Sequence, residues 1–205
     1  MPSWLLRFGV VCGVLTGLTL GPPALVEVFT GETTATSFVI GLGTVFGPPA
    51  LTALYLHHGL AADRFSAVAY AMNILGLTLF GAVAFSLNIV LFHLDQPTVA
   101  RLLAGPARLA LLTAAVVFVA GTVLFAASML RSRRFPRVPV YAYAVSLPLL
   151  ALLARLPDTP LTSAVHVTAA AALIWLSLSA WPGTGGIAVA RRGGTESGHV
   201  TRGRG

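Results

Sequence analysis

The side chains in this sequence that are best suited to chemistry are histidines and carboxylates near the ends of long apolar segments. His93 and Asp95 follow one such segment, and His166 lies about one helical turn inside another. Imidazole and carboxylate groups together bind divalent metals or relay protons, and two histidines at one depth can ligate a haem iron. Three further acids lie near segment ends, namely Glu27, Glu32 and Asp158.

These groups also have an ordinary interpretation, because acids in loops balance nearby arginines and histidines are common where a helix reaches an interface. Arg101, Arg108 and Arg155 lie near the same segment ends as these acids, which favours that interpretation. We therefore predict no bound metal and no cofactor, and retain His93, Asp95 and His166 only as candidate metal ligands.

No recognised catalytic motif accompanies these residues. The sequence contains no nucleophile elbow, Walker loop, HExxH, CxxC or dinucleotide fingerprint. Cys12 is the single cysteine, so no internal disulfide can form. An enzymatic activity is therefore less favoured than a non-enzymatic one.

The composition indicates an integral membrane protein. Hydrophobic residues make up 56% of the chain and charged residues 9%, with a mean hydropathy of +0.86, whereas a soluble domain carries about a quarter charged residues. All 13 basic residues are arginines, which suggests the codon bias of a GC-rich bacterial genome. Because these arginines lie beside apolar segments, the net charge of +7 indicates orientation in a bilayer and no nucleic-acid partner.

The chain is predicted to be an all-α, multi-pass bundle of about six transmembrane helices in a bacterial cell membrane. A spanning helix needs about 20 apolar residues. Residues 1–182 form the membrane domain, and residues 183–205 form a disordered basic tail, because that tail has no apolar periodicity. The predicted spans are residues 8–26, 38–56, 67–92, 109–130, 138–154 and 161–181.

The distribution of arginines predicts that both termini are cytoplasmic. Basic residues accumulate in the cytoplasmic loops of membrane proteins. With the N-terminus inside, ten arginines are cytoplasmic and three (Arg101, Arg108 and Arg155) are external. The histidines and acids discussed above then lie on the external side, which we call the outer side.

Glycines at four-residue intervals predict close helix packing. The first span carries four of them, and a neighbouring helix can approach such a face until the backbones touch. We expect the second span to occupy this face, with homodimerisation as the alternative. The packing glycines are Gly9, Gly13, Gly17 and Gly43.

A Gly-Pro-Pro-Ala-Leu motif occurs twice, 26 positions apart, within apolar segments. Proline removes a backbone donor and strains the preceding helical turn. We expect Pro22-Pro23 to end the first helix near the outer surface. We expect Pro48-Pro49 to break the second near mid-membrane and to deprive the carbonyls of Thr44 and Val45 of donors. The predicted kink residues are Gly21, Pro22, Pro23, Gly47, Pro48 and Pro49.

Two asparagines lie within the third predicted span. Asn73 and Asn88 are 15 residues apart, which returns them to about the same helical face. Amide side chains in membrane helices commonly bond to neighbouring helices. We predict that both asparagines do so.

One segment resembles a pattern found in multi-pass membrane proteins of actinobacteria that have no assigned activity. The segment runs from Met129 to Arg137 with the sequence MLRSRRFPR, and an apolar stretch containing Pro148 follows it. In those proteins, an arginine-bearing inner loop with a Pro-Arg pair joins two spans. The resemblance implies a topology and a source, and no activity.

Three functional hypotheses remain. The favoured one is a non-enzymatic accessory or interaction role, with the lipid bilayer and either another membrane protein or a second copy as partners. The second is a small transporter or channel that uses the two inverted Gly-Pro-Pro breaks. The third is a membrane enzyme or a metal or haem binder that uses the outer histidines and acids.

Overall fold

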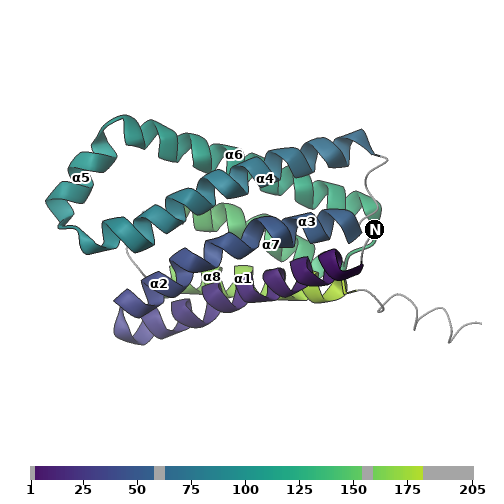
Figure 1. Ribbon diagram of the computed structural model, residues 1–205, viewed down its shortest axis with the longest axis horizontal. Helices are drawn as coiled ribbons and strands as arrows, with labels where there is room; N and C mark the ends of the chain where they lie inside the picture. The colour runs from purple at the N-terminus through teal and green to yellow at the C-terminus, as the bar shows by residue number, and fades with distance from the viewer. Residues whose placement is uncertain (1–2, 58–62, 154–158, 182–205) are drawn as a thin grey trace, which may run out of the picture.

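The computed structural model describes residues 3–57, 63–153 and 159–181, and in these ranges the chain is helical with short connections (Figure 1). The predicted tail, residues 183–205, lies outside the described residues. The helices are α1 (Ser3–Thr30), α2 (Thr34–Gly43), the 3₁₀ turn η1 (Thr44–Phe46), α3 (Gly47–His57), α4 (Arg64–Phe85), the π-helical segment η3 (Ser86–Val90), the 3₁₀ turn η4 (Leu91–His93), α5 (Gln96–Ala104), α6 (Pro106–Ser132), α7 (Arg137–Leu153) and α8 (Pro160–Ser179).

The long helices form a closed ring. Helices α2 and α3 continue each other through η1 as one rod, which packs on α1 and on α4. Helix α4 packs on α6, α6 on α7 and α7 on α8, and α8 closes the ring by packing on α1. Figure 1 shows α1 beside α8 and α4 beside α6. Neighbours in the ring are antiparallel, with α5 lying in the connection between α4 and α6.

Five helical segments in the described part of the chain are long and apolar enough to cross a bilayer. These are Ser3–Thr30, Thr34–His57, Arg64–His93, Pro106–Ser132 and Pro160–Ser179. Helix α7, at the position of the fifth predicted span, is apolar but has only 17 residues. The all-helical bundle is therefore confirmed, and a count of six spans stays a prediction.

The first proline pair does not end its helix, so that prediction was wrong. Helix α1 continues through Pro22-Pro23 to Thr30. The two prolines remove the N–H groups that would bond to the carbonyls of Leu18 and Thr19. The helix persists because α1 lies against α8, α3 and α2, and neighbouring helices allow a proline in a membrane helix to be tolerated.

The second proline pair does coincide with a helix irregularity, as predicted. The 3₁₀ turn η1 precedes it, and Pro48-Pro49 lies in the first turn of α3, where the fixed φ of proline suits the start of a helix. The expected loss at Thr44 was wrong, because the N–H of Gly47 donates to the Thr44 carbonyl. The Val45 carbonyl does lose its helical donors, since both residues that would supply them are prolines.

The glycine face of α1 packs within the chain, as predicted, but mostly against a different helix. Gly13, Gly17 and Gly21 face α8, and only Gly9 lies mainly on α3. A Cβ added to Gly17 would lie 2.8 Å from the carbonyl oxygen of Ala170, a backbone atom of α8. The closing contact between the first and last helices therefore depends on this face.

A second pair of glycines, which the sequence analysis did not identify, joins α4 to α6. A Cβ on Gly76 would lie 2.6 Å from the backbone nitrogen of Phe118, and a Cβ on Gly121 would lie 2.7 Å from that of Asn73. Each helix thus presses its backbone onto the glycine of the other. No side chain fits at either position unless the helices separate.

Asn73 connects three helices, which confirms its predicted interhelical role. Its Nδ2 donates to the Tyr143 hydroxyl of α7 at 2.7 Å, and its Oδ1 accepts from the Thr122 hydroxyl of α6 at 3.2 Å. Asn73 and Thr122 are fully buried. A polar cluster therefore fixes α4, α6 and α7 relative to one another.

Candidate binding cavity

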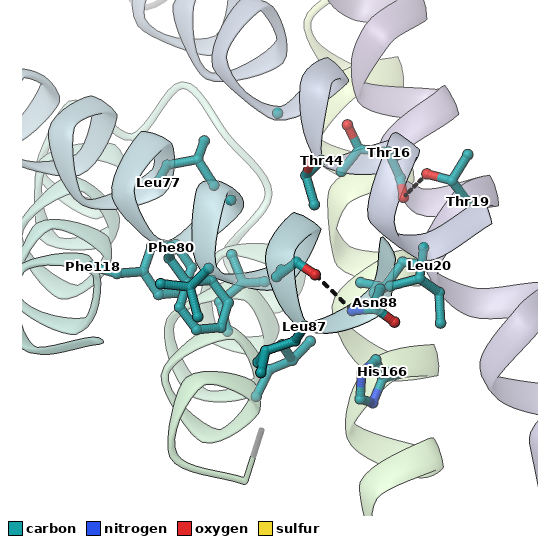
Figure 2. A pocket seen from close by; sticks show the side chains of 18 of the residues that line it. Thr16, Thr19, Leu20, Thr44, Leu77, Phe80, Leu87, Asn88, Phe118 and His166 are labelled. Atoms are coloured by element: carbon teal, nitrogen blue, oxygen red, sulfur yellow. Dashed lines mark hydrogen bonds between the residues drawn. The ribbon is translucent and has the colours of Figure 1, made fainter. Parts of the chain in front are cut away.

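The ring of helices encloses a cavity of about 690 Å³. Its inner part is apolar, with Leu54, Phe80, Phe118 and Leu173 among the residues that line it. Figure 2 shows part of this wall, with Phe80 and Phe118 at one side of the cavity. Ligand cavities in proteins commonly measure about 300–1,000 Å³ and have mostly apolar walls. The dimensions and the lining are those of a site for a small organic molecule.

One end of the cavity is polar. Glu27 lies near the end of α1, Glu32 lies in the turn that follows it, Gln96 begins α5, and Thr162 and His166 lie in the first turns of α8. Helix direction places all of these residues at the same end of the ring, and Glu32 and Gln96 are exposed there. The cavity therefore has a polar rim and an apolar interior.

His166 presents one defined nitrogen to the cavity. Its Nδ1 lies 2.8 Å from the Thr162 carbonyl oxygen, which can only accept, so Nδ1 carries the hydrogen. In the neutral ring, Nε2 then has a free lone pair. The side chain is half-buried and is directed into the cavity (Figure 2).

Asn88 lies in the π-helical segment η3 and also lines the cavity. Its Nδ2 donates to the Ala84 carbonyl of its own helix at 2.8 Å, drawn as a dashed line in Figure 2, in place of the interhelical bond predicted from sequence. The segment fits against α2 at Gly41, where an added Cβ would lie 2.8 Å from Cγ1 of Ile89. Single π-helical turns occur frequently at functional sites.

The three candidate metal ligands do not come together. In the ranges that the structure describes, no group of three or more His, Cys, Asp or Glu side chains could hold a metal ion. His166 lines the cavity, whereas His93 and Asp95 are not among its lining residues. Asp158 lies outside the described residues.

His93 and Asp95 have local structural roles. The ring of His93 lies 5.2 Å from that of Phe92 and 6.4 Å from that of Phe38, between ring centroids. Asp95 begins α5 by accepting a hydrogen bond from the Thr98 N–H at 3.2 Å. Hydrogen bonds from the side chain and backbone of Thr98 hold the pKa of Asp95 below its usual value.

Neither α5 nor the threonines that line the cavity were predicted from the sequence. Asp95 followed by Pro97 is a helix-start signal, and it would have predicted α5. Thr16 and Thr19 lie three residues apart on α1 and both line the cavity. Their spacing shows a shared face but gives no reason to assign that face to a cavity.

Comparisons with family models, with curated proteins and with solved structures find no match to this chain. The resemblance carried by residues 129–137 therefore stays a prediction. Any functional conclusion depends on the geometry of the cavity.

Proposed function

We propose that this chain is a multi-pass membrane protein with six spans that takes up a small molecule from the outer side into its central cavity, as a small transporter does in its outward-open state. The cavity is the observation that supports this proposal. A helical bundle with a purely structural role packs its interior closely. An opening of this size with mostly apolar walls therefore favours a site for a ligand.

Two irregular segments in the wall support the same proposal. The 3₁₀ turn η1 contributes Thr44 to the cavity, and the π-helical segment η3 contributes Leu87 and Asn88. Interrupted helices commonly form the binding sites of secondary transporters. The interaction role favoured by the sequence has no comparable support, since lipid would cover the apolar side chains that are exposed around the ring.

The proposed topology places the start of helix α1 and the end of helix α8 on the cytoplasmic side. Helix α1 begins and helix α8 ends at the same end of the ring, opposite the polar rim (Figure 1). In a Cys12→Ala background, an impermeant maleimide should label Asp95→Cys in intact cells and Ser132→Cys only after the membrane is opened. Cys12 is buried, so its replacement removes the native thiol without exposing a new surface. The reverse labelling pattern would contradict the orientation.

Uptake from the outer side predicts that the cavity admits water and ions. In the same background, Ala84→Cys should react with a charged methanethiosulfonate added outside, because Ala84 lines the cavity. Leu79→Cys lies on the lipid-facing surface of the same helix and should stay unreactive. A thiol reacts only as the thiolate, which does not form where lipid surrounds the side chain. Equal reactivity at the two positions, or none at Ala84→Cys, would contradict the proposal.

A further inference from the structure

The threonines that line the cavity have already used their donors. Each hydroxyl has one hydrogen and two lone pairs, and each donates its hydrogen to a carbonyl of its own chain segment, so a lone pair is what it can offer a ligand. The bonds run from Thr16 to Cys12 at 2.9 Å, from Thr19 to Leu15 at 2.9 Å, from Thr44 to Gly41 at 2.8 Å and from Thr162 to Thr159 at 2.7 Å.

The other polar groups near the rim follow the same pattern. His166 uses Nδ1–H on the Thr162 carbonyl and leaves Nε2 as an acceptor. Asn88 uses one N–H on the Ala84 carbonyl and leaves Oδ1 and its second N–H. The Glu32 carboxylate at the rim accepts from the Ser37 hydroxyl at 2.8 Å and has further lone pairs. The donors that remain are that second N–H and the amide of Gln96 at the rim, because the Tyr143 hydroxyl at the apolar end belongs to the buried cluster around Asn73.

The charge of the lining differs from that of the whole protein. The chain has 13 arginines and six acids, yet the described residues that line the cavity include two of the acids and no arginine. An anionic ligand would meet acceptors and carboxylates and would lose the hydrogen bonds it makes with water. A cationic donor would keep its hydrogen bonds.

We infer that the ligand is an amphiphilic primary amine, whose protonated ammonium group binds among the acceptors of Asn88, His166 and the rim, and whose hydrocarbon chain enters the apolar interior. This inference rests on the proposed function, because it identifies the substrate class of the same cavity. An ammonium group brings three N–H donors and a positive charge to a surface that offers acceptors. Leu77, Phe80 and Leu173 line the part of the cavity that would hold the chain.

Four probes that share the same ten-carbon chain separate the contributions that charge, N–H donors and the hydrocarbon chain make to binding. The full-length protein in nanodiscs is titrated calorimetrically with decylamine, decyltrimethylammonium, decan-1-ol and decanoate, and empty nanodiscs supply the partition background. We expect decylamine to bind at least about tenfold more tightly than decyltrimethylammonium, which has the charge and the chain but no N–H donor. Decanoate should show no saturable binding. Equal affinity of the two cations, or saturable binding of decanoate, would overturn the inference.

Two variants locate the ammonium site. His166→Phe and Asn88→Leu each remove an acceptor that faces the cavity, and each should weaken decylamine binding about tenfold. Thr78→Val is the matched control, because the Thr78 hydroxyl bonds to the carbonyl of its own helix outside the cavity. Decylamine affinity that is unchanged in both cavity variants, while their unfolding temperatures match that of the control, would overturn the assignment.

The two proposals can fail separately. Failure to label Ala84→Cys contradicts the proposed function. Labelling of Ala84→Cys together with no saturable binding of decylamine contradicts the amine inference alone.

Discussion

Replacing Gly76 by alanine should destabilise the protein by at least about 2 kcal/mol, whereas the same replacement at Gly81, in the same helix, should be neutral or stabilising. A Cβ at position 76 would lie 2.5 Å from the Cα of Phe118 and 2.6 Å from its backbone nitrogen. Because both are backbone atoms of α6, no side-chain rotation relieves the overlap. The two helices must move apart, and their contacts around Asn73 must loosen.

Gly81 provides a matched control. A Cβ there would meet only the Cβ of Thr44 at 3.6 Å, which is an ordinary contact. In a helix interior, alanine is favoured over glycine by about 1 kcal/mol. Thermal unfolding of the two variants in one detergent should therefore give shifts of opposite sign, with a fall of roughly 4–10 °C for Gly76→Ala. Similar unfolding temperatures for the two variants would contradict the close approach of α4 and α6.

The glycines show which part of helix packing can be predicted from sequence. Four glycines at a four-residue interval mark one face of α1, and that face does pack closely. The identity of its partner, α8, depends on how the chain closes the ring, which no local pattern encodes. Gly76 and Gly121 belong to different helices and have no regular spacing, so only the folded structure shows that they are paired.

The repeated Gly-Pro-Pro-Ala-Leu shows the limit of local sequence in another way. The same five residues continue an α-helix in α1 but follow a 3₁₀ turn at η1. Their surroundings differ, because Ala170 of α8 packs on Gly21 whereas Leu77 of α4 packs on Gly47. Neighbouring helices, and not the motif itself, decide whether the helix continues.

The candidate site was predicted in part for a related reason. Position along an apolar segment fixes how far a residue lies from the helix end, so Glu27, His93 and His166 were correctly placed at one end of the bundle. Rotation about the helix axis is fixed by the contrast between polar and apolar faces, and helices that are apolar all round lack that contrast. The sequence therefore did not indicate that His166 lines the cavity whereas His93 lies beside Phe38.

Replacing Asn73 by leucine should destabilise the protein by about 2 kcal/mol, because it removes the amide that bonds to two buried hydroxyl groups, those of Tyr143 and Thr122. Asn73 and Thr122 have no exposed surface, and Tyr143 is 3% exposed. Residue 73 packs on Gly121 through its backbone, so that contact is retained while both hydrogen bonds are lost.

A double-mutant cycle isolates the bond between Asn73 and Tyr143. Tyr143→Phe alone should lower the free energy of unfolding by about 1 kcal/mol, and it should lower it much less when Asn73→Leu is already present. The coupling energy between the two residues is then about 1 kcal/mol. Interhelical hydrogen bonds measured in a membrane protein have a mean coupling of about 0.6 and a maximum of about 1.7 kcal/mol. The coupling should lie above the mean because the 2.7 Å bond is wholly buried and shares its amide with α6. Denaturation in mixed micelles measures each corner of the cycle. If Asn73 made its hydrogen bonds within its own helix, as Asn88 does, the destabilisations by the two single variants would simply add. Additivity would therefore contradict the junction of α4, α6 and α7, on which the inner wall of the cavity depends.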